Sequence, residues 1–191
     1  MADAARQLMT AEEFYLWCES QEDRYELVDG VPVPLRAMAG ASDPHDAIVI
    51  NLIGTLYNQL AGSNCRPSSA DKALRTAIRR VRRPDVTIEC SPVTPKTYES
   101  RNPIAVFEVL SPTTRLNDRA EKLPEYMRHP SLKTIVHIDP DRMDVLVYFR
   151  AADGQWDTQR MLLADNILRV ADTSVAISLD DIYRGVPVEA A

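Results

Sequence analysis

The sequence predicts an α/β protein in which helices flank a mixed β-sheet, with additional antiparallel strands. Residues 104–110 form a nearly all-apolar run rich in β-branched side chains, which suits a central strand covered on both faces. Amphipathic patterns at about residues 44–61 and 117–128 indicate helices on either side of this run. An Asp-Gly pair at positions 29–30 marks an antiparallel hairpin near the start of the chain.

The composition predicts one soluble globular domain. The chain has 191 residues, 45% of them hydrophobic and 26% charged, so residues 1–191 can build a single core, with 1–9 and 186–191 as flexible ends. No run approaches the roughly 20 apolar residues of a membrane helix. Residues 1–10 also lack the apolar segment of a secretion signal. We therefore expect no membrane partner.

The cysteines bear on the cellular compartment. Cys18, Cys65 and Cys90 are far apart and form no metal-ligand spacing. An odd, scattered count fits reduced thiols, which predicts a cytoplasmic protein.

Charge is distributed unevenly along the chain. The net charge is −6, which does not indicate a nucleic-acid binder. Residues 66–83, however, hold seven basic residues against Asp71, a local charge of +6. This segment could meet phosphates, or its arginines could pair with the acidic remainder of the chain. The sequence leaves both interpretations open.

The first elements are predicted to be a helix and a hairpin. Thr10 and Glu13 have the spacing of a capping box, and apolar residues follow, so we expect a helix at about 11–22. Residues 24–33 contain the Asp-Gly turn and predict two antiparallel strands. Pro32 confines the second strand to the edge of a sheet.

The middle of the chain alternates helix and strand. The helix at about 44–61 should stop at Gly62. Residues 73–81 look like one strand with irregular alternation, and after a proline a new strand begins at 86–88. Three prolines make 91–103 a loop.

The second half predicts a helix and a series of strands. Pro124 must sit within the helix at about 117–128 or kink it. Ser178 should cap a short terminal helix. The expected strands are 134–138, 143–149, 156–163, 167–170 and 175–177.

Two carboxylates carry the clearest chemical signal. Asp85 opens one apolar run and Glu108 lies within another. Burying a lone charge is costly, so each needs a partner, and a divalent cation is the sharpest candidate. We expect Asp85 and Glu108, with the carbonyl of Val109, to bind Mg²⁺ or Mn²⁺. Lys122 would then add a positive charge beside the reacting phosphate.

Each of these residues also has a purely structural interpretation. Asp85 could end a turn, and Glu108 could pair with an arginine inside the sheet. Lys122 lies four residues after Asp118, and such a helical pair on the surface contributes only roughly 0.2–0.5 kcal/mol. The combination favours a site, because acidic residues in adjacent apolar runs are hard to explain otherwise.

Two further residues are catalytic candidates. Glu26 alternates with apolar neighbours in the first predicted strand, so it either faces solvent or approaches the metal site. His45 lies in the first turn of the helix at 44–61, where a histidine serves either as a surface or capping residue or as a catalyst.

Taken together these motifs resemble the Uma-two family of restriction-endonuclease-like proteins, within the PD-(D/E)XK nuclease superfamily. The resemblance runs from about Thr10 to Tyr183 and is most specific at Tyr25–Gly30 and Glu108–Thr114. The matching pieces are Arg24–Gly30, His45, Arg83–Asp85, Glu108–Thr114, Asp118, Lys122 and Tyr126.

The resemblance implies a restriction-endonuclease-like fold and Mg²⁺-dependent phosphodiester cleavage. Asp85 matches the superfamily's aspartate and Glu108 its second acidic residue. The superfamily's lysine would stand two residues beyond Glu108, where this chain has Leu110. Lys122 on the following helix resembles a migrated replacement, and Glu26 matches an acidic position that could add a ligand.

The function this predicts is a metal-dependent DNA endonuclease, a hydrolase acting on ester bonds. A homodimer is expected from the resemblance, because a duplex has two strands to cut. The alternative is a catalytically inactive nuclease-fold protein that binds nucleic acid or a protein partner. Leu110 and the acidic net charge favour that alternative.

Overall fold

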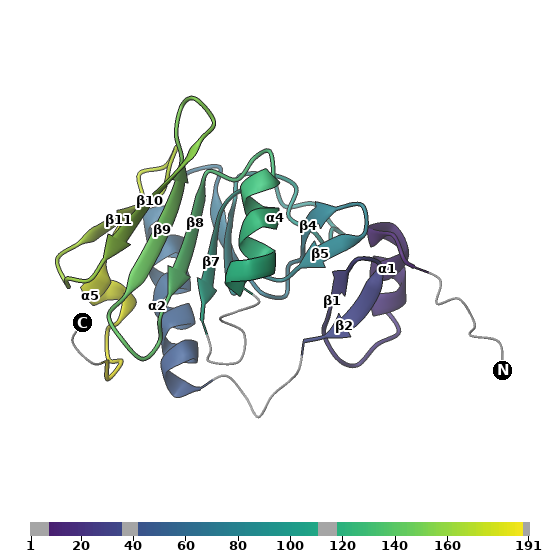
Figure 1. Cartoon of the computed structure of the whole chain (residues 1–191), viewed down its shortest axis with the longest axis horizontal. Coiled ribbons are helices and arrows are strands. Elements are labelled where there is room, and N and C mark those ends of the chain that lie inside the picture. The colour runs from purple at the N-terminus through teal and green to yellow at the C-terminus, as the bar shows by residue number, and fades with distance from the viewer. Residues whose placement is uncertain (1–7, 36–41, 111–117, 189–191) are drawn as a thin grey trace.

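The computed structural model describes residues 8–35, 42–110 and 118–188, and its helices pack around two main β-sheets (Figure 1). The larger sheet has six strands in the order β10-β9-β8-β7-β6-β3, and only β7 and β8 are parallel. This mixed sheet confirms the predicted fold class. Its strands are β3 (Arg66–Ser69), β6 (Val86–Glu89), β7 (Pro103–Val109), β8 (Thr134–Ile138), β9 (Val145–Arg150) and β10 (Trp156–Met161).

The smaller sheet is antiparallel and stands beside the larger one, with the helix α1 on one of its faces (Figure 1). Its strand order is β2-β1-β5-β4. The bounds are α1 (Ala11–Cys18), β1 (Tyr25–Val28), β2 (Val31–Pro34), β4 (Leu74–Ala77) and β5 (Arg80–Arg82). Phe14 of α1 packs against Leu27 and Val81, which fixes the helix on this sheet.

The predicted capping box opens α1. The Thr10 hydroxyl accepts the Glu13 N–H at 3.3 Å, and the Glu13 carboxylate accepts the Thr10 N–H at 2.7 Å. The helix ends at Cys18, four residues before the expected position. Residues 19–23 are polar or acidic, so a longer helix would have no apolar side chain to bury.

The hairpin of β1 and β2 forms as predicted. Asp29 and Gly30 have φ values of 49° and 83°, the positive values that this two-residue turn requires. A Cβ atom on Gly30 would lie 2.8 Å from the Leu8 Cβ, so glycine is also needed for packing. Pro32 pairs with Leu27 in the edge strand β2, where a missing N–H is tolerated.

The single strand predicted at 73–81 is wrong. The chain forms β4, turns at Ile78 and Arg79, and returns as β5. Neither turn residue is a glycine, proline, asparagine or aspartate, so the sequence carries no local turn signal there. β3 was also missed, because its sequence Arg-Pro-Ser-Ser has no strand-like pattern.

The larger sheet is covered on both faces. α2 (Asp43–Gln59) lies behind it and α4 (Leu123–Arg128) in front of it (Figure 1). Every residue of β7 is buried, which confirms the predicted central strand. Alternate β7 residues face the two helices: Phe107 packs in the core with Leu52 of α2, and Val106 in the core with Tyr126 of α4.

The helix predicted at 117–128 has two parts. Residue 117 lies outside the described residues. Asp118–Lys122 forms a π-helical segment, and α4 follows at Leu123. Pro124 stands in the first turn of α4, directly after the π-helical segment. Pro124 therefore lies within the helix, which is one of the two outcomes that the sequence allowed.

The C-terminal elements agree with prediction to within about two residues. β11 (Ile167–Arg169) pairs with β12 (Ala176–Ser178), and α5 (Leu179–Ile182) follows. The Ser178 hydroxyl accepts the Asp181 N–H at 3.0 Å, as the predicted cap requires. No helix within the described ranges has the length and apolar character needed to cross a membrane.

The expectation of three reduced thiols is wrong. Cys65 and Cys90 form a disulfide, and Cys18 is free. The antiparallel strands β3 and β6 pair in a register that sets Arg66 opposite Glu89. Cys65 precedes Arg66 and Cys90 follows Glu89, so this register brings the two cysteines together. Because the cytoplasmic prediction rested on reduced thiols, it loses that support.

Candidate active site

The proposed site residues gather where the two sheets meet α4. β1 contributes Glu26, β7 contributes Glu108, and the π-helical segment contributes Lys122. Asp85 stands just before β6, and His45 lies in the first turn of α2. Five segments that are far apart in the sequence therefore approach one another.

The Asp85 carboxylate is fixed beside the main chain of β7. Val86 pairs with Phe107 in the antiparallel strands β6 and β7. Asp85 precedes Val86 and Glu108 follows Phe107, so Asp85 and Glu108 lie level with each other. The Val109 N–H donates to Asp85 Oδ2 at 2.8 Å. The Asp85 side chain keeps 22% of its surface exposed, so a ligand can reach it from solvent.

His45 is brought to Asp85 by α2. Its Nε2 atom lies 3.4 Å from Asp85 Oδ2, and its side chain is 20% exposed. The helix N-cap is Ser42, so His45 is not the capping residue.

Glu108 is buried on the face of the sheet that α4 covers. The Tyr126 hydroxyl donates to Glu108 Oε1 at 2.6 Å, and Lys122 Nζ lies 3.5 Å from the same oxygen. Burial raises the pKa of Tyr126 well above its usual value, and the negative charge of Glu108 raises it further. Tyr126 therefore stays protonated and acts as a donor.

Lys122 is buried rather than exposed. Only 7% of the residue is accessible, and its Nζ atom lies 3.6 Å from Glu26 Oε1 as well as near Glu108. The ammonium thus bridges a carboxylate of each sheet. The side chain of Asp118, its alternative partner, lies outside what the structure describes.

Glu26 is also buried, with 5% of its surface exposed, so it does not face solvent. Its Oε1 atom accepts the Arg83 N–H at 2.9 Å. Its Oε2 atom accepts a hydrogen bond from Arg82 Nη1 at 3.1 Å. Counting Lys122, three donors or cations surround one carboxylate.

Arg82 was missed by sequence reasoning, and it is fully buried at the centre of this network. It donates to Glu125 at 2.6 and 2.9 Å and to Glu26 at 3.1 Å. Burial alone would raise the pKa of Glu125, but hydrogen bonds from Arg82 and Thr76 and the positive charge of Arg82 outweigh it and lower that pKa. Arg82 lies in a run of basic residues, and nothing local distinguishes it from the other arginines of that run.

The basic segment at 66–83 is largely neutralised within the protein. Arg66 and Lys72 approach Glu89, while Arg75 pairs with Glu12 and Glu99. Arg80 pairs with Asp29 and Glu125. For these residues the pairing interpretation is confirmed, and they do not form a stripe of uncommitted charge for phosphates.

The donor set fits a hard cation that keeps several waters. Across the described ranges, no three His, Cys, Asp or Glu residues gather into a metal site. Mg²⁺ is commonly held by only one or two carboxylates, with water and substrate phosphates completing its shell. Asp85 and Glu108 meet that requirement, and Val109, the expected carbonyl ligand, ends β7 next to Glu108.

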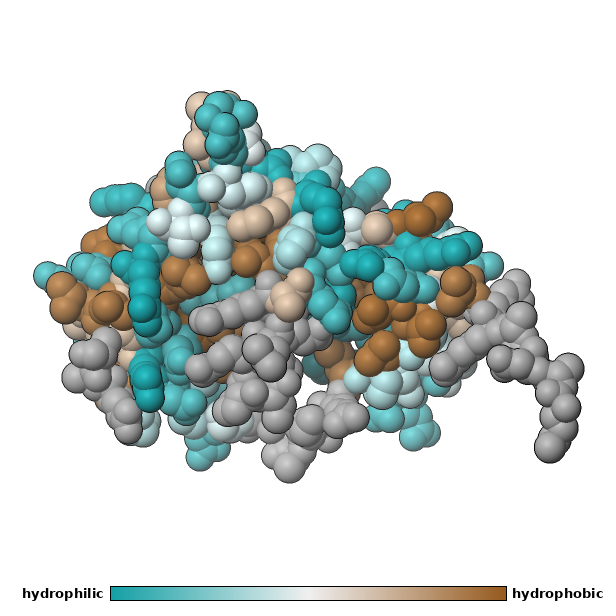
Figure 2. All heavy atoms as spheres, viewed as in Figure 1, coloured by the Kyte–Doolittle hydropathy of each residue, from teal (hydrophilic) through white to brown (hydrophobic). Residues whose placement is uncertain are grey.

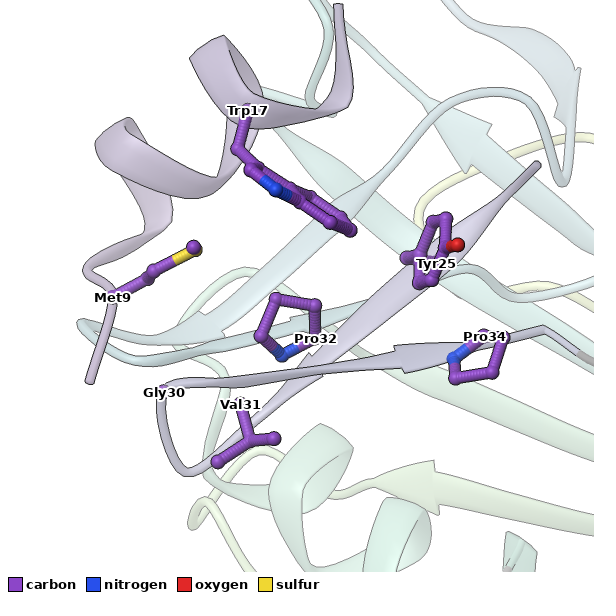
Figure 3. A pocket seen from close by; sticks show the side chains of 7 residues that line it. All are labelled: Met9, Trp17, Tyr25, Gly30, Val31, Pro32 and Pro34. Atoms are coloured by element: carbon purple, nitrogen blue, oxygen red, sulfur yellow. The ribbon is translucent and has the colours of Figure 1, made fainter. Parts of the chain in front are cut away.

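A pocket of about 400 Å³ lies on the other face of β1 (Figure 3). Tyr25 lines it, whereas the next residue, Glu26, faces Lys122, as strand alternation requires. Figure 2 shows apolar side chains over the region of α1 and the smaller sheet. Two apolar residues of this region, Leu16 and Ile78, are each 69% exposed. The pocket is lined by Met9, Trp17, Tyr25, Gly30, Val31, Pro32 and Pro34, none of them a proposed site residue.

The fold places the chain in the class of restriction-endonuclease-like α/β proteins. It is similar to the crystal structure of a "putative nuclease belonging to DUF820" from Anabaena variabilis, with a TM-score of 0.73. That similarity covers 94% of this chain and 99% of the other at 19% identity, and so concerns the fold alone.

The family follows from the sequence itself. The model of the Uma2 family, described as "Putative restriction endonuclease", matches residues 11–180, and the chain belongs to this family. It is also 28% identical over 180 residues to an uncharacterized protein of Synechocystis sp., covering 93% of each chain.

Proposed function

We propose that the protein is a metal-dependent DNA endonuclease that hydrolyses phosphodiester bonds. One observation carries the proposal: a buried lysine lies 3.5 Å from Glu108, while Asp85 is bound to the peptide N–H that follows Glu108. Family membership supports a nuclease acting on DNA. Buried clusters of charged side chains of this kind are rare in a purely structural core, because buried charges are costly.

Asp85 and Glu108, with the Val109 carbonyl, are the residues that would hold the cation. Bound Mg²⁺ or Mn²⁺ would supply a water of lowered pKa and neutralise charge on the phosphate. The protein prepares both carboxylates for this task. The Val109 N–H orients Asp85, and the Tyr126 hydroxyl orients Glu108.

Lys122 supplies the second positive charge. In this proposal its ammonium stabilises the charge that develops on the phosphate, or orients the attacking water. It takes the role that the superfamily gives to the position of Leu110, which is 1% exposed here and belongs to the core. His45, at 3.4 Å from Asp85, orients that carboxylate or accepts a proton at the mouth of the site.

A homodimer is part of the proposal, because two active sites are needed to cut both strands of a duplex. The edge strand β2 is poorly suited to pair with a second copy in a dimer interface. Val28 and Val31 flank a two-residue turn and pair with each other, so the backbone of Val31 points toward β1. Because backbone direction alternates along a strand, the positions whose N–H would point away from β1 are those of Pro32 and Pro34. Proline offers no N–H there, and an added strand would find no donors. Sedimentation velocity tests the dimer itself.

A plasmid-nicking assay tests the activity. Wild-type protein with Mg²⁺ or Mn²⁺ should relax supercoiled DNA, and chelation should stop it. Asp85→Ala, Glu108→Ala and Lys122→Ala should each lower the rate by roughly 10²-fold or more. Glu89→Gln is the matched control, because Glu89 is a buried, ion-paired carboxylate at the opposite end of β6.

Circular dichroism shows whether each variant is folded. Undiminished cleavage by folded Asp85→Ala and Glu108→Ala proteins would refute the assignment.

The second candidate is a nuclease-fold protein that no longer cuts and binds nucleic acid or a protein partner. Two observations favour it: Leu110 occupies the usual lysine position, and the net charge is −6. Calorimetric titration with Mn²⁺ separates the two functions. Absence of binding at millimolar Mn²⁺ would support the binding protein.

A further inference from the structure

We propose that Glu26 is a positioning residue, whose carboxylate holds the Lys122 ammonium beside Glu108, and that Glu26 is not a metal ligand. The effect of Glu26 on cleavage rests on the proposed function, whereas the contact between Glu26 and Lys122 does not. This assigns Glu26 differently from the sequence, which suggested an additional ligand.

The geometry places Lys122 between two strands of different sheets. Its Nζ atom lies 3.6 Å from Glu26 Oε1, on β1, and 3.5 Å from Glu108 Oε1, on β7. The small sheet thereby takes part in the site through one acidic side chain.

Glu26 is poorly suited to bind a cation. Its Oε1 atom already accepts the Arg83 N–H at 2.9 Å, and its Oε2 atom accepts from Arg82 at 3.1 Å. A divalent ion would have to displace a main-chain donor from one carboxylate oxygen and an arginine from the other.

The same contacts make Glu26 a rigid support. Arg82 is itself held by two hydrogen bonds from its guanidinium to Glu125. β1 and β5 pair through Leu27 and Val81, the neighbours of Glu26 and Arg82 in the two strands. The carboxylate is therefore fixed by both a main-chain donor and a clamped arginine.

Lys122 needs such a support because of its own flexibility. A lysine side chain has four rotatable methylene links and loses about 2 kcal/mol of rotamer entropy when it is fixed. Glu108 alone, at 3.5 Å, makes a long contact with it. A second carboxylate, Glu26 of the smaller sheet, restricts the position of the ammonium further.

A double-mutant cycle in urea tests the contact without any activity assay. The variants are Glu26→Gln, Lys122→Met and the double variant, followed by circular dichroism of the metal-free protein. We expect the urea midpoint of the double variant to fall by less than the sum of the falls in the two single variants, because each single change removes the same interaction. Additive losses would overturn the proposal.

Metal binding and cleavage test the role. Glu26→Gln should leave the affinity for Mn²⁺ unchanged in calorimetry and lower the cleavage rate at saturating metal by about tenfold or more. In the Lys122→Met background, Glu26→Gln should change the residual rate no further. Glu89→Gln serves as the control for removing a buried carboxylate.

The possible failures are distinguishable. A marked loss of Mn²⁺ affinity in Glu26→Gln would make Glu26 a ligand and refute the proposal. A further loss of cleavage in the Lys122→Met background would show that Glu26 acts independently of the lysine, which also refutes it. If wild-type protein cuts no DNA, the proposed function fails, while the urea cycle and the Mn²⁺ titration still decide the role of Glu26.

Discussion

Replacing Arg82 with methionine removes the cation that two buried carboxylates share. Arg82 is 0% exposed and donates to Glu125 at 2.6 Å and to Glu26 at 3.1 Å. Removing one partner of a buried ion pair costs about 3–5 kcal/mol, because the other charge stays buried. Glu125 retains Arg80 at 2.8 Å, which places the expected loss toward the lower end. The melting temperature should fall by about 6–20 °C.

The loss depends on pH, with a sign that follows from Glu125. In the wild type the pKa of Glu125 lies below its usual value, so the ionised group stabilises the fold above its unfolded pKa, and this stability is lost as pH falls through the folded pKa. Without Arg82, burial acts against fewer donors and the pKa rises. The penalty for the charged group then disappears as pH falls, so the difference between Arg82→Met and wild type should shrink as pH falls through the raised pKa of Glu125.

Urea unfolding at several pH values measures this difference. Arg160→Met is the matched control, since Arg160 is 62% exposed and pairs with Asp144 at 2.6 Å. A surface pair of this kind contributes about 0–1 kcal/mol. Equal losses for the two variants, or a loss for Arg82→Met that grows as pH falls, would refute the buried network as a source of stability.

Three further changes test other parts of the structure by the same unfolding measurement. Tyr126→Phe should cost about 1.5–3 kcal/mol, because it removes a 2.6 Å hydrogen bond to a buried carboxylate, and an unchanged midpoint would contradict that contact. Gly30→Ala should cost more than Gly154→Ala: both have positive φ, but only Gly30 has an atom within 2.8 Å of the added Cβ. Cys65→Ser opens a loop closed over 25 residues and should cost about 3 kcal/mol relative to the oxidised wild type, whereas a stability well below that of the reduced wild type would place part of the effect elsewhere.

Local chemistry explains which elements could be predicted. The capping box at Thr10, the Asp29-Gly30 turn and the Ser178 cap each depend on residues within four positions of one another. The central strand β7 could be predicted because burial on both faces demands an unbroken apolar run. These signals are complete within a short window of sequence.

The missed elements depend on contacts that no window contains. The turn at Ile78 forms because β4 pairs with β5, and neither of its two residues is of a type that favours turns. The bond between Cys65 and Cys90 depends on the pairing of β3 with β6. Since β3 itself has no strand pattern, the approach of its flanking cysteine could not be inferred.

The residues of the candidate site also differ in whether a short window of sequence could reveal them. Asp85 and Glu108 were found because acidic residues in apolar runs stand out locally, and the register then brings the two residues level. The burial of Glu26 and Arg82 depends on how the small sheet meets α4, a tertiary arrangement with no sequence signature. The sequence therefore indicated which residues carry charge but not which charges face one another.

Under the proposed function, the buried charges of the small sheet follow from the position of Lys122. A lysine at position 110 would be held by β7 itself, but Leu110 fills that position, with its N–H bonded to Ile138 at 2.8 Å. Lys122 instead reaches Glu108 from a helix, along a flexible stem that requires a second contact. Glu26 provides that contact, and a buried glutamate in turn requires Arg82. In the proposed site, a lysine carried by the helix thus accounts for the buried Glu26 and for the arginine beside it.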